Sequence, residues 1–227
     1  MGLYGDFKRS LRGRSQIERD NELLQVKKKA ESGDAESQFI VGCWHYYGYD
    51  VVKDVAISLK WFEKAAREGE ARAQTALGSM YEVGLGVEQD DFKASEWYQM
   101  AARQGEPNAL FNLGTMHGDQ DCSLYDSEHS EEYFLRAKEE YLKGASLGDA
   151  DHQLRMGENC FEGFGCIQDF QEAYTWFLKS ADQGEVDAQV YLWFMHEKGI
   201  GVEVDAESAE KWWSEIGDHE GDEAFYN

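Results

Sequence analysis

The chain has 227 residues, with 22 Lys+Arg against 45 Asp+Glu and a formal net charge of −23 at pH 7. A surface this acidic repels nucleic-acid phosphates, so DNA and RNA are not expected partners, and anionic membrane surfaces are disfavoured for the same reason. Hydrophobic residues at 42% and aromatic residues at 14% argue against a disordered chain. A single proline favours a helical protein.

The sequence predicts a cytoplasmic protein. Its N-terminus has no apolar stretch of the kind found in signal peptides, and no later run is apolar and long enough to span a membrane. The cysteines, which show no paired framework and are expected to be reduced, are Cys43, Cys122, Cys160 and Cys166. A mature chain that has lost a signal peptide is the lesser alternative.

A repeat of about 36 residues organises most of the chain. Its boundary glycines are Gly33, Gly69, Gly105, Gly148 and Gly184, and the steps between them are 36, 36, 43 and 36 residues. Several other columns keep the same phase. Trp61, Trp97 and Trp176 each stand eight residues before the next boundary glycine, and Trp212 stands eight before Glu220, one further period along the chain. Chance would not place this many residue types at the same position of each period. We therefore interpret the chain as an array of repeats.

In chain order, residues 1–15 are expected to be a flexible segment and residues 16–31 a single helix ahead of the first complete unit. Units are predicted at about 33–68, 69–104, 105–147, 148–183 and 184–217, and residues 218–227 are expected to form an acidic C-terminal tail. The third unit has seven additional residues. We assign them to an exposed, acidic loop at 119–132.

Each unit is predicted to contain two helices. The first, such as 71–83, carries Ala73, Leu77 and Tyr81 on one stripe and ends at a glycine. The second begins after an aspartate such as Asp90, whose side chain can accept from first-turn N–H groups. Units of this kind bury their apolar faces only against their neighbours. The prediction is therefore an all-α, right-handed α-solenoid of about five helix-turn-helix repeats with an N-terminal extra helix.

These columns also match a known family. The pattern A-x-x-x-L-G-x-x-Y, then G-x-G-V, then D, A, W-Y and A-A-x-x-G resembles the Sel1-like repeat, a relative of the tetratricopeptide repeat, over about residues 33–217. The third unit lacks the glycine pair, and Trp193 stands where glycine is usual. The resemblance implies a curved solenoid that binds proteins and is not an enzyme.

The acidic excess is uneven along the chain. Residues 1–72 hold 13 basic and 12 acidic residues, whereas residues 73–227 hold 9 basic and 33 acidic residues. One explanation is a solvated surface that keeps the protein soluble. The other is electrostatic attraction of a basic protein partner.

No catalytic or metal-binding constellation appears in the sequence. His45, His117 and His196 share a column with Tyr81 and are expected to be packing residues. The 119–132 segment has calcium-loop spacing at its start but Leu124 where the loop needs glycine. We predict no metal, no cofactor and no enzymatic activity.

The family analogy places the first helices on the concave face, with the outward positions, which face away from the core, 3, 6, 10, 13 and 14 residues after each boundary glycine. The residues predicted there to bind a partner are Glu36, Phe39, Tyr46, Tyr47, Arg72, Glu82, Asn108, Phe111, Asp119, Glu158, Phe161, Glu162, Phe194 and Glu197. Asp151 and Asp187 stand at the outward position three residues after their boundary glycines. Aromatic rings with a charged rim are typical of binding hot spots. The alternative is that some of these rings pack into the core.

The expected function is a monomeric binding protein that masks a basic protein partner, for example as a cytosolic immunity or inhibitor protein. A scaffold or adaptor in signalling or complex assembly is the alternative, and an enzyme is a remote one. The sequence does not identify the partner.

Overall fold

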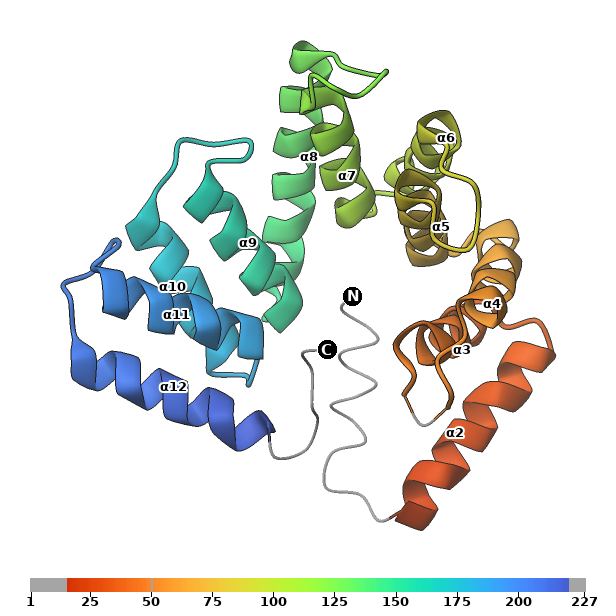
Figure 1. The fold of residues 1–227 in the computed structure, drawn as a ribbon, viewed down its shortest axis with the longest axis horizontal. Helices are drawn as coiled ribbons and strands as arrows, with labels where there is room; N and C mark the ends of the chain where they lie inside the picture. The colour runs from red at the N-terminus through yellow and green to blue at the C-terminus, as the bar shows by residue number, and fades with distance from the viewer. Residues whose placement is uncertain (1–15, 50, 221–227) are drawn as a thin grey trace. The chain divides into compact units, whose positions relative to one another are not determined.

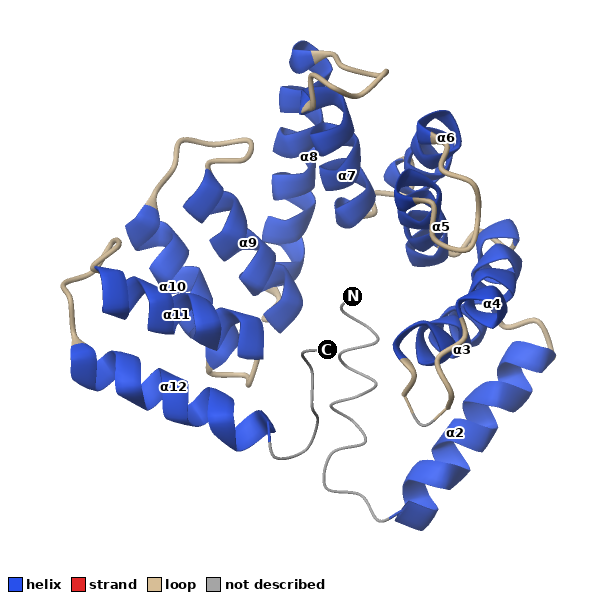
Figure 2. Cartoon of the chain, in the orientation of Figure 1, coloured by secondary structure: helices blue, strands red, loops and turns tan. Residues whose placement is uncertain are grey.

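A computed structural model of the chain describes residues 16–49 and 51–220. The expected N-terminal segment 1–15, and residues 221–227 of the expected tail, lie outside the described residues. In the described part the secondary structure is helical, with no strand (Figure 1, Figure 2). The helices are α2 (Gln16–Glu31), α3 (Ala35–Tyr47), α4 (Val55–Arg67), α5 (Ala71–Val83), α6 (Asp91–Ala102), α7 (Pro107–Gly118), α8 (Ser127–Ser146), α9 (Ala150–Glu162), α10 (Phe170–Ala181), α11 (Val186–Lys198) and α12 (Ala206–Glu220). Residues 218–220, predicted to belong to the tail, continue α12.

Local chemistry sets the helix ends. The Asp90 carboxylate accepts a 3.0 Å hydrogen bond from the backbone N–H of Lys93, so it caps α6. Gly84 closes α5 with φ of 71° in the left-handed region, where glycine has no steric penalty, and its N–H donates to the Met80 carbonyl. The predicted pattern of an aspartate before each second helix and a glycine after most first helices is therefore present as capping geometry.

Consecutive helices pack against each other in two compact units, residues 16–137 and residues 138–220 of the described chain. In the first unit the consecutive helices α2, α3, α4, α5, α6 and α7 pack against one another in that order. In the second unit α9, α10, α11 and α12 do the same. Contacts between sequential neighbours are the signature of a repeat array. The fold is an all-α solenoid with a repeat of about 36 residues, as predicted.

In three repeats, a buried glutamine of the first helix donates a hydrogen bond to a backbone carbonyl of the preceding helix. Gln38 Nε2 donates to the Ala30 carbonyl at 3.1 Å, and Gln74 Nε2 donates to the Ala66 carbonyl at the same distance. Gln153 repeats this contact in the second unit, with a 3.3 Å bond to the Ala145 carbonyl. A buried side-chain amide needs such a partner, so the bond fixes how each first helix sits on the preceding second helix.

The third repeat is longer because its second helix is longer. The predicted loop at 119–132 is wrong in this respect, since the loop covers only residues 119–126 and α8 begins at Ser127. Asp126 follows Asp90 by one regular period and accepts from the N–H groups of Glu128 and His129. α8 has 20 residues, whereas α10 has 12. The seven extra residues add about two turns, so the helix keeps its buried face.

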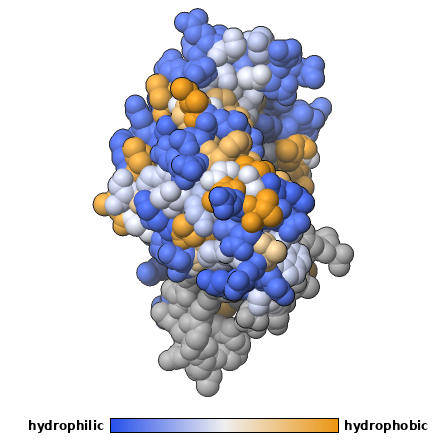
Figure 3. All heavy atoms as spheres, turned by 90° about the vertical axis from the view of Figure 1, so that its left-hand side faces the viewer, coloured by the Kyte–Doolittle hydropathy of each residue, from blue (hydrophilic) through white to orange (hydrophobic). Residues whose placement is uncertain are grey.

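In the described part of the chain, no helix is both long enough and apolar enough to cross a membrane. Figure 3 shows one face of the molecule, where hydrophilic residues cover most of the surface and hydrophobic residues form small, separate areas.

Candidate functional site

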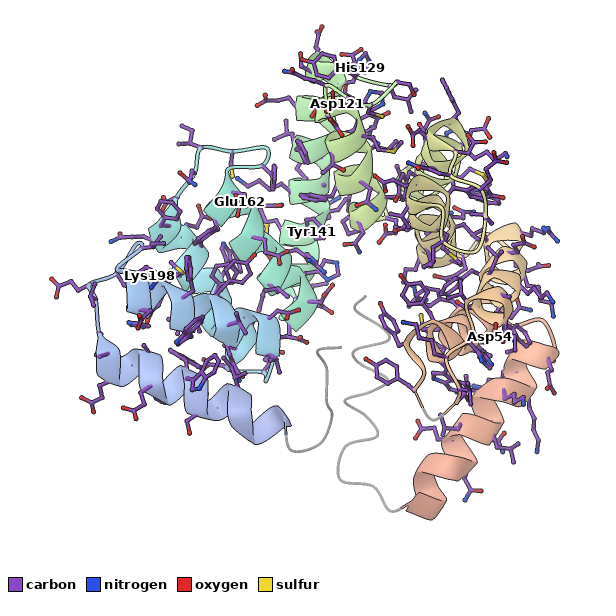
Figure 4. The ribbon with its side chains drawn as sticks, in the orientation of Figure 1. Asp54, Asp121, His129, Tyr141, Glu162 and Lys198 are labelled. Carbon is purple, nitrogen blue, oxygen red and sulfur yellow. The ribbon has the colours of Figure 1, made fainter. Side chains whose placement is uncertain are left out.

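In the second unit, the first helix of each repeat presents a face formed by positions 3, 7, 10 and 14 after the boundary glycine. These spacings of four, three and four residues place the side chains on one side of a helix. In the second unit the positions hold Asp151, Arg155, Glu158 and Glu162 on α9, and Asp187, Tyr191, Phe194 and Lys198 on α11. All eight are half-buried or exposed, whereas Leu154 and Leu192 between them are buried. Figure 4 shows Glu162 and Lys198 at the C-terminal ends of their helices.

Four carboxylates on this surface, those of Asp151, Glu158, Glu162 and Asp187, are named here the α9–α11 acidic face. One guanidinium lies among them: Arg155 Nη1 donates to Glu158 Oε2 at 2.7 Å, and about a quarter of each side chain is exposed. Burial raises the pKa of Glu158, and Asp187 and Asp151 raise it further, while Arg155 lowers it. A raised pKa means that the single guanidinium does not offset burial and the other negative charges.

An aromatic group adjoins the α9–α11 acidic face. The ring of Tyr191 stacks on that of Phe177, with centroids 4.3 Å apart and planes inclined by 6°, and it lies 5.5 Å from the ring of Phe161. Burial raises the pKa of Tyr191 to about 12, and Glu158 and Glu162 contribute in the same direction. The face thus combines carboxylates with half-buried rings, the chemistry that attracts a cation.

The first unit has a related arrangement that is neutralised internally. Arg72 Nε lies 2.6 Å from Glu70 Oε1, and Arg72 Nη2 lies 4.0 Å from Glu36 Oε1. The guanidinium carbon lies 4.7 Å from the centroid of the Phe39 ring. Glu36 and Arg72, both predicted to bind a partner, therefore pair with each other across α3 and α5.

Phe39 is the clearest departure from the prediction of an exposed aromatic floor. Its side chain is 5% exposed, and its ring lies 5.7 Å from that of Phe62, within the core of the first unit. At about 100° per residue, positions 6 and 13 lie roughly 70° to 90° away from the centre of the exposed face. Position 6 therefore lies at the edge of the exposed face. Phe39 and Leu154 are buried there, whereas Val190 at the same position of α11 is exposed.

The remaining predicted aromatic residues of the first unit are half-buried. Tyr46 and Tyr47 meet edge to face, with centroids 4.9 Å apart, and the ring of Phe111 meets that of Phe134 at 5.3 Å. Each ring is partly exposed and also makes contacts within the fold. The structure therefore leaves an accessible part of these rings without making them a continuous apolar floor.

Three predicted polar residues of the first unit have intramolecular roles. Glu82 Oε2 accepts a 2.6 Å bond from the hydroxyl of Tyr98. Asn108 Nδ2 donates to Glu106 at 3.0 Å, and the Asp119 carboxylate accepts from the backbone N–H of Asp121 at 2.9 Å. Of these three, Asp119 is exposed, at the end of α7.

In the second unit the predicted residues lie closer together. Phe161 and Phe194 are half-buried, and Glu158 and Glu162 lie on the same helix face. Glu197 is exposed and lies 3.5 Å from Lys198 Nζ. The second unit therefore brings together Glu158, Phe161 and Glu162, and it is the more complete candidate site.

Two residues of this site escaped the sequence prediction. Arg155 and Tyr191 both stand at position 7, which the analogy omitted, although position 7 shares a helix face with positions 3, 10 and 14. The spacing alone could have identified them.

Within the described residues, no group of three or more His, Cys, Asp or Glu side chains could hold a metal ion. The histidines predicted to pack do so at two positions: the ring of His117 stacks on Tyr133 with centroids 5.4 Å apart, and His196 Nε2 lies 3.2 Å from the Tyr174 hydroxyl.

The family model of the Sel1 repeat matches the chain at residues 35–70, 71–106, 107–140, 151–185 and 186–218. A search of curated proteins finds no match. Among solved structures, a protective antigen of uropathogenic Escherichia coli is 34% identical, with a TM-score of 0.53. The match covers 87% of this chain but only 41% of that one.

Two other solved structures cover more of their own length. A Sel1 repeat protein of Oxalobacter formigenes is 25% identical over 90% of this chain and 84% of its own, with a TM-score of 0.57. The immunity protein PA5088 of Pseudomonas aeruginosa is 16% identical over 97% and 81% of the two chains, with a TM-score of 0.57, a likeness that shows the fold alone. Five family matches over most of the sequence are consistent with the capped, sequentially packed helix pairs. The chain therefore belongs to the Sel1 repeat family, whose fold mediates protein–protein interaction.

Proposed function

We propose that the chain is a non-catalytic, cytoplasmic protein that binds and masks a basic protein partner, as an immunity or inhibitor protein does. The observation that carries the proposal is that negative charge and partly exposed aromatic rings lie side by side on helices α9 and α11. Residues 73–227 hold 33 acidic and 9 basic residues, and the α9–α11 acidic face adjoins the half-buried rings of Phe161 and Tyr191. Carboxylates attract a basic surface, and the rings supply contact area once water is displaced.

The fold is compatible with this role. PA5088 of Pseudomonas aeruginosa has a similar fold and is an immunity protein. The sequence likeness is low, so that comparison supports the scaffold, while the charge and the rings of this chain support the choice of a basic partner.

The experiment begins with capture of the partner from a host lysate at low salt, followed by purification of both proteins. Affinity is then measured at about 50 mM and about 500 mM NaCl, where the screening length becomes much shorter. We expect the affinity to fall about tenfold or more at high salt. An affinity that hardly changes would contradict electrostatic masking and favour an apolar adaptor.

A matched pair of variants locates the charge. Glu162→Gln with Asp187→Asn removes two exposed carboxylates of the α9–α11 acidic face, while Glu96→Gln with Glu139→Gln removes two exposed carboxylates from the second helices α6 and α8. The first pair is expected to weaken binding several times more than the second, because only its members adjoin the proposed surface. Equal losses would mean that overall charge, and not this surface, attracts the partner.

A further inference from the structure

The two units differ at one pair of equivalent positions. The third residue after the boundary glycine is Glu36 and then Arg72 in the first two repeats, and it is Asp151 and then Asp187 in the last two. In the first unit this pair of positions brings a carboxylate within 4.0 Å of a guanidinium. In the second unit both positions carry carboxylates, and the internal cation is instead Arg155, four residues after Asp151, which bonds to Glu158.

The charged groups of the second unit lie close enough to act on one another, since Arg155 bonds to Glu158 at 2.7 Å. Asp151 and Asp187 both raise the pKa of Glu158, and Asp187 also acts on Tyr191. Arg155 pairs with Glu158, and Lys198 on the same face pairs with Glu197, whereas Asp151, Glu162 and Asp187 form no ion pair with a described residue. Bringing a second cation to the α9–α11 acidic face would lower the energy of this arrangement.

The first unit indicates which cation fits. There, the guanidinium of Arg72 lies over the ring of Phe39 while its nitrogen atoms approach the carboxylates of Glu70 and Glu36. A planar, weakly hydrated guanidinium can stack on a ring and bond to carboxylates at the same time, which the compact ammonium group of lysine does less well. In the second unit, Tyr191 supplies the ring and the acidic face supplies the carboxylates.

We propose that Asp151, Glu158 and Asp187, with the half-buried ring of Tyr191, form a docking surface for an arginine side chain of the protein partner. The proposal rests on the proposed function and deepens it. Asp187 is exposed and the other three residues are half-buried, so an arginine can approach from solvent along α11. The carboxylates favour a cation and the ring of Tyr191 favours a guanidinium, so the occupant of this surface is an arginine side chain exposed on the partner.

The test uses the full chain and a hexa-arginine peptide, with a hexa-lysine peptide as the comparison, both measured by calorimetric titration. We expect the native chain to bind the arginine peptide about fivefold more tightly than the lysine peptide. Asp187→Arg gives the second unit the residue that the first unit has at this position. This variant should weaken arginine-peptide binding about tenfold or more, because its own guanidinium occupies the surface.

The matched control is Glu210→Arg, which makes the same change of charge at an exposed position of α12. It is expected to weaken binding less than about threefold, since only the overall charge changes. Asp187→Asn removes one carboxylate without adding a cation and should give an intermediate loss. Circular dichroism and the melting temperature of each variant establish that the helices remain intact.

Tyr191→Leu separates a binding role of the ring from a packing role. Leucine preserves apolar contact with Phe177 but removes the aromatic face, so the preference for arginine over lysine is expected to fall to about onefold. Equal losses for Asp187→Arg and Glu210→Arg, or an unchanged peptide preference in Tyr191→Leu, would overturn the docking surface while leaving the proposed function standing. A native chain that binds neither peptide would overturn both.

Discussion

A Cβ atom added to Gly78 would lie 2.5 Å from Cδ1 of Tyr98, so the bare Cα of this glycine allows the ring to lie directly against α5. The same relationship holds at three other repeats. The pairs are Gly42 with Phe62, Gly114 with Phe134 and Gly157 with Phe177. The ring of each of these second helices therefore packs on the backbone of the first helix in its own repeat, which sets how closely the two helices approach.

Gly78→Ala is expected to destabilise the fold by about 1–3 kcal/mol, because the added methyl group must displace the buried ring of Tyr98. Urea denaturation measures this loss. Gly217→Ala is the control: Gly217 is helical, with nothing within 4 Å of the added Cβ, so this change should stabilise the fold by up to about 1 kcal/mol. Equal effects of the two substitutions would refute the packing role of Gly78.

The hydroxyl of Tyr98 gives a second prediction. It donates a 2.6 Å bond to Glu82, and burial raises its pKa, so Tyr98→Phe should cost about 1–2 kcal/mol of stability. Glu82→Gln retains an acceptor and should cost less. Chemical denaturation of both variants checks the order, and an unchanged midpoint in Tyr98→Phe would show that the bond adds nothing to stability.

A buried glutamine stands at the fifth position of four repeats, and its role can be tested at Gln153. Gln153→Leu loses the bond to the Ala145 carbonyl and the 2.8 Å bond that Gln153 Oε1 accepts from Gln183 Nε2, and it should cost about 1–3 kcal/mol. The third repeat has the buried Leu110 at this position, so a leucine side chain fits there. Gln153→Ala also leaves a cavity and should cost more. Thermal melting that ranks alanine as the milder change would contradict this assignment.

The first turn of α8 predicts a pH dependence. His129 Nδ1 lies 2.8 Å from Asp126 Oδ2, and this bond raises the pKa of His129 above 6.5 and lowers that of Asp126 below 3.8. Protonation of His129 therefore contributes fully to the stability of the fold below pH 6.5, and this contribution is lost as the pH rises through the folded pKa of His129. The contribution of the Asp126 carboxylate is lost as the pH falls through the folded pKa of Asp126.

Proton NMR titration of the His129 ring measures this directly. In Asp126→Asn the midpoint should fall back towards 6.5, while the asparagine still caps the helix. Asp121→Asn removes the same charge from the neighbouring loop and should shift the midpoint much less. In Figure 4 both Asp121 and His129 lie at the same end of the α7–α8 hairpin, which makes the comparison a stringent one. Identical shifts would attribute the effect to net charge.

The sequence was sufficient to predict features that depend on local chemistry. Helix α2, the aspartate caps and the glycine ends follow from residues within one or two turns of each other, and a strict period makes each signal visible several times. Phe39 shows where this reasoning fails. Its burial depends on an angle of roughly 70° around the helix axis, which an analogy between families does not define.

The position of the ring in the second helices illustrates a similar limit. The tryptophan column attracts notice, yet Trp61, Trp97 and Trp176 are half-buried, and the residues after them, Phe62, Tyr98 and Phe177, pack on the glycines. In the last repeat Trp193 replaces the glycine, and Trp213 is 58% exposed, with its ring 5.1 Å from that of Trp193. Either of two adjacent aromatic residues could pack against the glycine of the first helix, and only the three-dimensional packing determines which of them does so.

The extended α8 restricts how an array of this kind can change length. A helix that gains seven residues is rotated by only about 20° relative to its former register, whereas a gain of five would turn the rest of the helix by about 140°. Phe134 and Tyr141, which are seven residues apart, can therefore both lie on the same side of α8. Natural insertions or deletions inside second helices are accordingly expected in steps of seven, while loops tolerate any number.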